Sequence, residues 1–520
     1  MRRGSRSVGR GGLGVIAITT LLVIQLMQPA VALAAPDRPR TLRVGPHGRF
    51  TSIQAAVNAA SPGDWILIPP GDYHEHGGPN AGVLITTPNL HLRGLDRNRV
   101  IVDGTKPDAN ATVPCSPDPA AQDFGPLDSS GNATGRNGIE VFKADGVTIE
   151  NLTVCNFLGG ASGSNGNQVW WNGGDGSGRI GLGSLRGEYL TASSTYFRDA
   201  NSAMAQYGIF TSNEGGPGLL AHTYASNMGD SSYYVGACTD CRVVLTDAHA
   251  QNSALGFSGT NAGGHLILES SEWDHNRAGI VPNSLNNDDA PPPQNGACPL
   301  EPENSCTIIR DNLVHDNNNP NTPESGLAGA SPVGAGIELS GSQNDTVTNN
   351  IVFNQGGWGI VINDYPDSET PPEVSHCQGG IQFPGACYFL AFGNRIEHNR
   401  LSENGSFGNP SNGDLADVTT APLPGEAGNC FVDNHDTEGP LTSDPSAIQT
   451  ALGQCGEPNA GGDVFVAGAQ LLCATGTQPE PCGGTYPQTT NVEMLPIPQD
   501  LPTMPDPCAN VPKPGSHRCH

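Results

Sequence analysis

A short repeat through the middle of the chain constrains the fold more than any other feature of the sequence. A glycine followed by an apolar residue recurs, and within its regular stretches the apolar positions lie 22 or 23 residues apart. These positions are Ile139, Ile209, Val235, Phe257, Ile280, Ile337 and Ile360, where Val235 precedes its glycine and fills a gap. A unit of this length is too short for parallel strands joined by a helix, and its alternating runs lack helical periodicity. Each unit is therefore predicted to add one coil to a stack of parallel strands.

Asparagines form a second ladder in the same region. Its members are Asn227, Asn252, Asn276, Asn317, Asn354 and Asn404, of which the first three recur at 25 and 24 residues. At a fixed turn, asparagine tolerates the left-handed backbone conformation and can hydrogen-bond to its copy in the next coil. We interpret this ladder as architecture and not as an active site.

Composition excludes a helical bundle and a nucleic-acid partner. The 520 residues include 69 Gly and 44 Pro, and interior glycine and proline destabilise a helix by about 1 and about 3 kcal/mol each. The 24 Lys and Arg face 51 Asp and Glu, a formal net charge of −27, whereas phosphate binding needs a basic surface. The same deficit favours a neutral glycan over a polyanionic polysaccharide as ligand.

The N-terminus is typical of a secretory signal peptide. Four arginines precede an apolar run over residues 15–26, and Ala32-Leu33-Ala34 supplies a small-residue cleavage pattern. The run is shorter than the roughly 20 residues of a membrane span. We therefore expect a secreted, extracellular protein with no membrane span after signal removal, and leave its oligomeric state open. The predicted parts are a signal peptide over 1–35, a coil domain over 36–435 and a Cys/Pro-rich cap and extension over 436–520.

The 14 cysteines are an even number, as suits an oxidising compartment. Sequence alone leaves their connectivity open, and our hypothesis is that near neighbours pair. The pairs are Cys115–Cys155, Cys238–Cys241, Cys298–Cys306, Cys377–Cys387, Cys430–Cys455, Cys473–Cys482 and Cys508–Cys519. The alternative for Cys238 and Cys241 is a zinc site, but no second CxxC or histidine pair has ligand spacing.

The segment before the first coil predicts a short capping helix. Ile53, Ala56, Val57 and Ala60 recur with helical spacing behind Thr51-Ser52. This opening, TSIQAAVNAASPGDWILIPPGDYHEH followed by NLHLRGLDRNRVIVDGT, resembles that of the pectin-lyase-like, right-handed parallel β-helix superfamily. The resemblance covers most of residues 41–435 and implies an all-β, single-stranded parallel β-helix.

That resemblance implies no particular reaction. The segments typical of pectin methylesterases, polygalacturonases and pectate lyases are not found in this sequence. The predicted function is action on, or binding of, an extracellular polysaccharide, as a lyase or glycoside hydrolase if it is an enzyme. The alternative is a non-catalytic glycan-binding or structural protein of the cell surface or extracellular space, because function must be argued from a site and not from a fold.

Two long insertions, residues 282–306 and 363–387, follow the Gly-apolar ladder at the same register. We expect them to leave the stack at one corner and to wall a groove. The predicted catalytic residues of this groove are Asp274, His275, His315, Asp316 and Asp364. Carboxyl groups with different environments can act as acid and base in glycoside cleavage.

Each of these residues has an alternative interpretation. His275 and Asp316 directly precede ladder asparagines and can be solvated turn residues instead. Asp288, Asp289 and Asp364 could bind Ca²⁺, which prefers oxygen ligands, although they lack a recognisable loop spacing. Apart from this Ca²⁺ alternative, no cofactor is predicted.

Aromatic residues suggest a substrate-binding surface. Trp170, Trp171 and Asp175 lie in a Gly-rich stretch, and Tyr365 follows Asp364. Exposed aromatic rings commonly stack on sugars. The alternative for the two tryptophans is a local hydrophobic plug, and Trp273 is predicted to lie in the core.

Overall fold

The computed structural model describes residues 38–45, 48–107, 113–161, 164–198, 203–286, 305–368, 376–475 and 486–512. Residues 39–520 form one compact unit, and the predicted signal peptide lies outside the described residues. Among the residues so described, no helix combines the length and apolarity needed to cross a bilayer.

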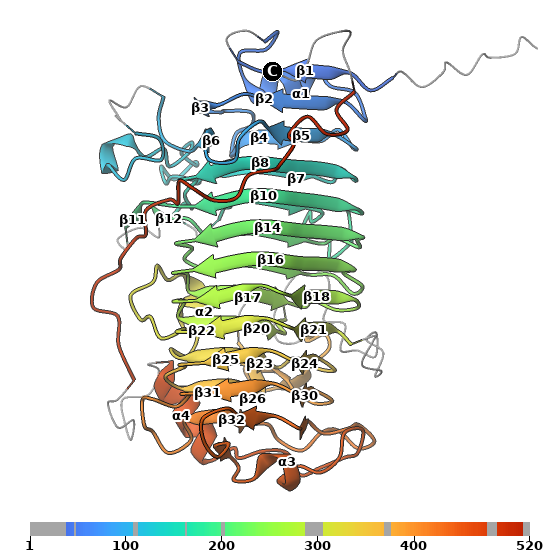
Figure 1. Cartoon of the computed structure of the whole chain (residues 1–520), viewed down its shortest axis with the longest axis vertical. Coiled ribbons are helices and arrows are strands. Elements are labelled where there is room, and N and C mark those ends of the chain that lie inside the picture. The colour runs from blue at the N-terminus through green and yellow to red at the C-terminus, as the bar shows by residue number, and fades with distance from the viewer. Residues whose placement is uncertain are drawn as a thin grey trace, which may run out of the picture. The chain divides into compact units, whose positions relative to one another are not determined.

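The unit is a parallel β-helix, as predicted (Figure 1). One column of strands is an 11-stranded parallel sheet. Its strands are β4 (Ala81–Ile85), β7 (Asn137–Phe142), β9 (Val169–Asn172), β13 (Tyr207–Ser212), β15 (Ser231–Gly236), β17 (Leu255–Thr260), β20 (Ala278–Asn283), β23 (Ala335–Ser340), β26 (Trp358–Asn363), β32 (Gly413–Asp417) and β35 (Ser443–Asp444).

Nineteen further strands form a second parallel sheet, which bends into two limbs. Four nine-residue strands pass through both limbs: β8 (Val147–Cys155), β10 (Leu185–Ser193), β14 (Gly218–Ser226) and β16 (Val243–Gln251). Limb A adds β1 (Thr41–Arg43), β2 (Trp65–Ile68), β5 (His91–Gly94), β18 (Leu266–Glu269), β21 (Thr307–Arg310), β24 (Thr346–Thr348), β30 (Arg395–Glu397) and β33 (Cys430–Val432). Limb B adds β3 (Gly71–Tyr73), β6 (Val100–Asp103), β19 (Glu272–Asp274), β22 (Leu313–His315), β25 (Ile351–Phe353), β31 (Arg400–Ser402) and β34 (His435–Asp436).

The Gly-apolar ladder is the inward row of the 11-stranded sheet. Phe257 pairs with Ile280, Ile280 with Ile337, and Ile337 with Ile360. The gap before Phe257 is filled by Tyr233 and not by Val235, so that assignment is wrong. Tyr233 suits the core because its hydroxyl donates to Thr223 Oγ1 at 3.0 Å.

The asparagine ladder is architectural, as predicted, but it consists of two neighbouring rows. Asn227, Asn252 and Asn354 occupy the corner itself, with φ of 67°, 49° and 52°. Asn276 and Asn317 lie one residue later and point inward, where Asn276 Nδ2 donates to Asn317 Oδ1 at 3.0 Å. Stacked amides thereby replace backbone partners at the turn.

Short helices cover parts of the stack. The predicted capping helix is α1 (Ile53–Ala59), whose N-cap Ser52 accepts from Ala55 N at 3.2 Å. The other short elements are a 3₁₀ helix, η1 (Pro119–Ala121), α2 (Gly326–Gly329), α3 (Ile448–Ala451) and α4 (Val466–Ala474), and the antiparallel strands β11 (Phe197–Arg198), β12 (Ala203–Met204), β27 (Tyr365–Asp367), β28 (Ile381–Phe383) and β29 (Ala386–Phe389).

Residues 486–512 form an extended strap that runs back along the coils. Leu495 N donates to Asn227 Oδ1 at 3.0 Å, and Thr41 Oγ1 in the first strand donates to Pro512 O at 2.9 Å. The strap follows one edge of limb B and then crosses the sheet near β8 and β10 (Figure 1). The strap therefore contacts both the first strand and a coil in the middle of the stack.

Four of the predicted disulfides are confirmed: Cys115–Cys155, Cys238–Cys241, Cys377–Cys387 and Cys430–Cys455. Cys306, Cys473 and Cys508 are also disulfide-bonded, and their predicted partners lie outside the described residues. Because Cys238 and Cys241 bond to each other, they do not form a zinc site.

Candidate functional site

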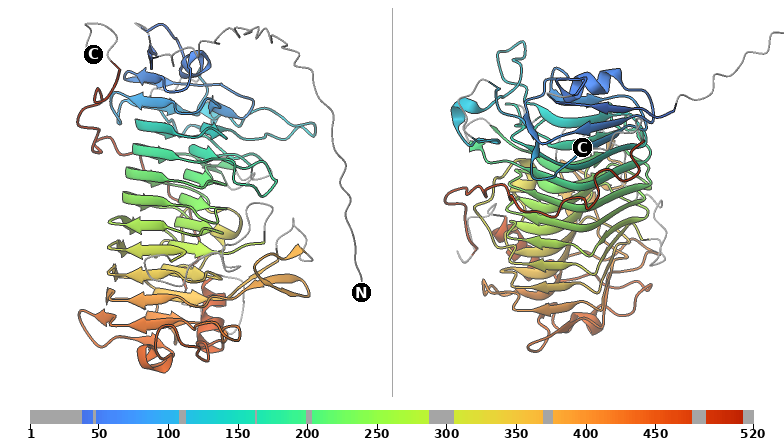
Figure 2. Two further views of the ribbon diagram at one scale, coloured as in Figure 1. Left: turned by 90° about the vertical axis from the view of Figure 1, so that its right-hand side faces the viewer. Right: turned by 45° about the horizontal axis from the view of Figure 1, so that its top comes forward.

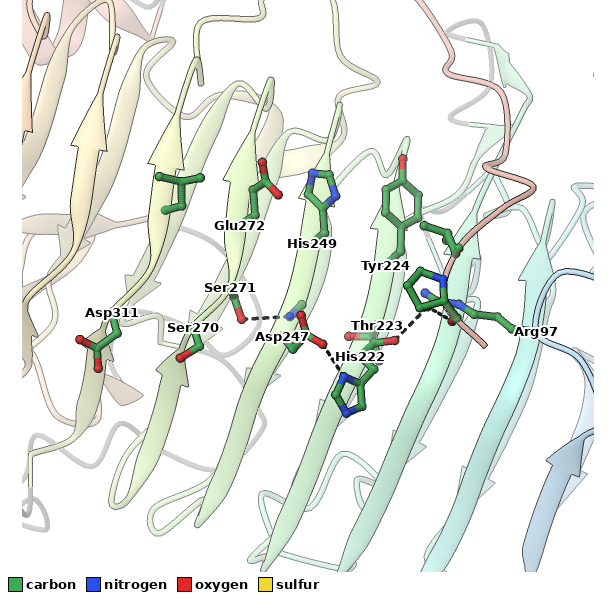
Figure 3. A pocket seen from close by; sticks show the side chains of 14 residues that line it. Arg97, His222, Thr223, Tyr224, Asp247, His249, Ser270, Ser271, Glu272 and Asp311 are labelled. Carbon is green, nitrogen blue, oxygen red and sulfur yellow. Dashed lines mark hydrogen bonds and ion pairs between the residues drawn. The ribbon is translucent and has the colours of Figure 1, made fainter. Parts of the chain in front are cut away.

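A pocket of about 480 Å³ lies on the outward face of limb B, between β14 and β22 (Figure 3). Its lining consists of Arg97, His222, Thr223, Tyr224, Asp247, Ala248, His249, Ser270, Ser271, Glu272, Asp311, Leu313, Leu501 and Pro502. Polar and apolar groups both line it, as is usual for binding sites. Residues of four successive coils line this pocket.

Strand alternation explains which side chains reach the pocket. In β16 and β19, Ala250 and Trp273 point into the core, so His249 and Glu272 point outward. His249 and Glu272 are register partners on neighbouring strands. Their side chains remain 30% and 44% exposed, so both are accessible to a ligand.

Asp274 anchors one half of the polar cluster. Its carboxylate contacts His249 Nε2 at 2.6 Å and His275 Nδ1 at 2.5 Å, and accepts from Gln251 Nε2 at 2.7 Å. Burial by itself raises the pKa of Asp274. The hydrogen bonds with His249, Gln251 and His275 lower it by more, so the net pKa lies below its ordinary value. Asp274 is therefore an anion that orients His249 and is itself covered.

His315 anchors the other half. Its Nδ1 contacts Asp316 Oδ2 at 2.7 Å, its Nε2 contacts Glu272 Oε1 at 3.2 Å, and its ring stacks on Phe353 at 4.9 Å. Burial lowers the pKa of His315, but the bonds to Asp316 and Glu272 raise it more, so the net pKa lies above its ordinary value. His315 lies between the carboxylates of Asp316 and Glu272 and holds Glu272 in place.

A second imidazole–carboxylate pair lines the corner between the limbs. His222 Nδ1 pairs with Asp247 Oδ2, and the His222 ring stacks on Tyr189 at 4.5 Å. His222 and Asp247 are on neighbouring coils and both have a left-handed backbone. The pocket therefore has a carboxylate-bound histidine on each side, His222 on one and His249 on the other (Figure 3).

Four of the five predicted catalytic residues lie together at this cluster. Asp274 and His315 belong to β19 and β22, and His275 and Asp316 occupy the adjoining corner with φ of 53° and 55°. The backbone of His275 and Asp316 is therefore that of turn residues, as the alternative interpretation has it. It does not separate them from the cluster, because both bond to its members.

Asp364 lies elsewhere. It follows β26 in the 11-stranded sheet, and its carboxylate accepts from Ala391 N at 2.8 Å and from Thr420 N and Oγ1 at 2.9 and 2.8 Å. Its grouping with Asp274 is wrong, because the corner that follows β26 is not the corner that follows β19. Both carboxylate oxygens accept bonds that tie loops together, so the residue is committed to structure.

The two insertions leave the same corner, as expected, but not beside the cluster. Asn283 and Asn363 both pair with Ser340 in register, and Asn286 N donates to Asp367 Oδ2 at 2.6 Å. In Figure 2, β27–β29 project from one side of the coils and the strap follows the other. The described parts of the insertions thus lie away from limb B, and Asp288 and Asp289 lie outside the described residues.

The aromatic prediction is corrected in part. Trp171 is fully buried in the core, so the expected exposed pair does not exist. Trp170 points outward but stacks on Phe210 at 5.0 Å and 3°, which covers one face of its ring. Asp175 is exposed and pairs with Lys143, and Tyr365 belongs to β27, where it pairs with Phe389.

His249 and Glu272 were not predicted from the sequence. The signal was present in β16, where TDAHAQ alternates polar residues with alanine and places His249 and Gln251 on one face. His249, Glu272 and Asp274 could hold a metal ion, since one ligand atom of each lies within 4.8 Å of the others. Both Asp274 oxygens already accept hydrogen bonds, so a metal would have to displace one of them.

No protein-family model matches the sequence, and no curated protein matches it. Similar solved structures include the A-module of the Azotobacter vinelandii mannuronan C-5 epimerase AlgE4, 13% identical over 74% of this chain and 90% of that chain, with a TM-score of 0.39. Another is the catalytic domain of a GH87 α-1,3-glucanase, 13% identical over 80% and 67%, with a TM-score of 0.41. The tailspike of E. coli bacteriophage HK620 is 11% identical over 78% and 64%, with a TM-score of 0.42. These values are too low to transfer an activity.

Proposed function

We propose that this protein is a secreted enzyme that hydrolyses a neutral polysaccharide, with His249 and Glu272 as the groups that touch the reacting bond. The observation that carries the proposal is the pairing of these two exposed side chains on neighbouring strands at a pocket. The buried Asp274 holds His249 in position, and the half-buried His315 holds Glu272. Acid–base catalysis needs two positioned groups of this kind.

The reaction follows from the two environments. His249, oriented by Asp274 through Nε2, donates a proton from its other ring nitrogen to the glycosidic oxygen. Glu272, oriented by His315, accepts a proton from the attacking water. Water thus adds across the bond, and proton exchange with solvent restores both side chains.

The charged residues of the pocket favour a neutral substrate over a polyuronate. They therefore favour hydrolysis over elimination. Elimination requires a cation to neutralise the sugar carboxylate. Arg97 is the single lysine or arginine among the described pocket-lining residues. Its guanidinium donates to Thr191 Oγ1 and to backbone oxygens, including His222 O. Among the described residues that line this pocket, no lysine or arginine therefore remains free to bind a polyanion.

The fold suits a polymer better than a compact ligand. Outward positions on successive coils recur about every 4.8 Å, which is near the length of one sugar residue. Tyr224, His249 and Glu272 form such a row. A glycan lying along limb B would meet one side chain of the row per sugar.

A substrate screen tests the proposal. The purified protein is incubated with dextran, β-1,3-glucan, xylan and galactomannan, and in parallel with alginate and polygalacturonate, and new reducing ends are measured. We expect release from a neutral polymer, and a fall of about two to four orders of magnitude in Glu272→Gln.

The matched control is Asp433→Asn, an exposed corner residue on a later coil that does not line the pocket. It should retain full activity. Unsaturated products from alginate or polygalacturonate would overturn hydrolysis, and glycan binding without turnover would support the non-catalytic alternative.

A further inference from the structure

We propose that the strap closes one end of the limb B pocket, so that the site accepts the end of a glycan chain and not its middle. The inference rests on the proposed function and adds the mode of attack. It starts from the position of Leu501 and Pro502, which line the pocket although they come from the far C-terminal part of the chain.

Hydrogen bonds fix the strap where it crosses limb B. Asn98 Nδ2 donates to Leu501 O at 2.9 Å, and Leu501 N donates back to Asn98 Oδ1 at 3.1 Å. Asn151 Oδ1 accepts from Thr503 Oγ1 at 2.7 Å and from Met504 N at 2.9 Å. The strap is thus bonded to the coils at Leu501 itself and directly after Pro502.

Arg97 connects the strap to the pocket floor. Its Nη1 donates to Pro502 O at 3.1 Å and to His222 O at 3.0 Å. Its Nε and Nη2 donate to Thr191 Oγ1 at 2.8 Å and Leu190 O at 2.6 Å. Arg97 is only 2% exposed, so these bonds are shielded from water. The strap at this point is a fixed wall.

Exposure changes along one outward row of limb B. The row pairs in register from Thr153 through Thr191, Tyr224, His249, Glu272, Leu313 and Ile351 to Arg400 and His435. Its first three members are at most 4% exposed, whereas Ile351 is 38% exposed and Arg400 and His435 are also exposed. The row is therefore covered from Thr153 to Tyr224, of which only Tyr224 still lines the pocket, and it is open beyond Glu272.

A linear glycan can extend in one direction from such a site. From Glu272 toward the strap there are only the coils of His249 and Tyr224, which is room for about two sugar residues at about 4.8 Å per coil. In the other direction the outward row continues past Ile351 to His435. Cleavage at Glu272 would release a short product of about that size from a chain end.

End-blocked oligosaccharides test the closed end directly. Glu272→Gln, in the full chain, is titrated with linear isomalto-, laminari-, xylo- and manno-oligosaccharides of increasing length, each with a bulky tag on the reducing end, on the non-reducing end, or on neither. We expect one of the two tags to weaken binding by about 100-fold or more and the other to have little effect. Equal binding of both tagged forms would overturn the closed end alone.

Strap variants assign the effect to the wall. Leu501→Ala with Pro502→Ala should reduce the discrimination between tags at least tenfold. Met504→Ala, a half-buried strap residue that does not line the pocket, should leave it unchanged. Discrimination that persists in the double variant would overturn the role of these two residues. If no oligosaccharide binds at millimolar concentration, the proposed function fails together with the closed end.

Discussion

Two stretches of the chain have nearly the same sequence pattern but different surroundings. GIEVFKADGVTIENLTV begins at Gly138 in an early coil, and GIELSGSQNDTVTNNIVF begins at Gly336 in a late one. Asn151 and Asn349 turn the same corner, with φ of 59° and 57°. The early coil crosses this corner in one strand, β8, whereas the late coil breaks into β24 and β25.

The residue after the corner explains the difference. Leu152 points into an apolar core in the early coil. Its counterpart Asn350 joins a buried amide stack, where it donates to Ile309 O and Asn399 Oδ1 and accepts from Asn312 N. Side-chain amides take over backbone hydrogen bonds there, so the turn no longer needs a continuous strand. At this position the early coil is therefore held by apolar packing and the late coil by polar stacking, although one apolar core runs through both.

The largest expected effect is on activity, and it is a comparison of two histidines in the outward row of limb B. His249 and His435 occupy the same outward row, but only His249 has Asp274 behind it. We expect His249→Gln to reduce turnover of the polysaccharide found in the screen by about 100-fold or more, and His435→Gln to leave it unchanged. Equal losses of turnover in the two variants would mean that a place in the row determines activity, and not contact with Asp274.

Replacing the inward residues that follow the corner, Leu152 and Asn350, should have the next largest effect, which is on stability. Asn350→Leu copies the early coil into the late one and removes the side-chain partners of Ile309 O and Asn312 N, whereas Asn399 Oδ1 keeps the bond from the backbone N of residue 350. A loss on the order of 3 kcal/mol in the free energy of unfolding follows from buried unpaired groups. Leu152→Met, which conserves volume, should lose less than about 1.5 kcal/mol. Urea unfolding, with hydrogen exchange of β21 and β24 amides, measures both.

A pH-dependent effect should separate the two Gly-Ile-Glu segments. Glu338 is fully buried, its Oε2 has no hydrogen-bond partner among the described residues, and burial raises its pKa from 4.5 to about 8. Between these values the folded state keeps a proton that the unfolded state releases, so stability falls as pH rises. Glu338→Gln should match the wild type at pH near 4.5 and exceed its melting temperature above pH 8.

Glu140 provides the matched control for this comparison. It is half-buried and accepts from Asn137 Nδ2 and Asn172 Nδ2 at 3.1 and 2.9 Å. Glu140→Gln should keep the decrease in melting temperature with rising pH that the wild type shows. Part of that decrease will also remain in Glu338→Gln, because burial raises the pKa of Asp345 to about 7.

The smallest effect is expected on the outward face. Ile351→Thr introduces the early-coil residue at an exposed position and should change stability by less than about 0.5 kcal/mol. Thr153→Ile should cost more, because Thr153 Oγ1 donates to Arg97 O at 2.8 Å beneath the strap. Limited proteolysis, followed by mass spectrometry of residues 486–512, should detect loosening of the strap in Thr153→Ile alone.

The repeat and its corners could be predicted because they depend on local chemistry. Each coil buries a Gly-apolar pair and turns at a residue that accepts positive φ, so both leave a periodic signal. The substitution of Tyr233 for an aliphatic residue broke that signal, since a buried phenol needs a partner that only the fold supplies. The four described disulfides were predictable because their cysteines are near in sequence.

The residues that meet at the proposed site could be predicted in part. Asp274, His275, His315 and Asp316 were named from the sequence because they flank ladder positions, and the structure brings them together. His249 and Glu272 were missed because their importance comes from contacts across 25 and 43 residues. Asp364 was misplaced because equal register along the chain does not reveal which of the three strand columns a loop leaves.

By itself, the sequence determined the parallel coils, the turn positions, the capping helix and the near-neighbour disulfides. In each of these cases the interacting groups are one coil apart or less, so spacing along the chain reflects spacing in space. Only the tertiary structure decided that limb B carries the pocket and that the strap crosses it. The strap has no repeat of its own, and its partners, such as Asn98 for Leu501, lie about 400 residues away. Such a contact depends on the complete stack and leaves no local pattern in the chain.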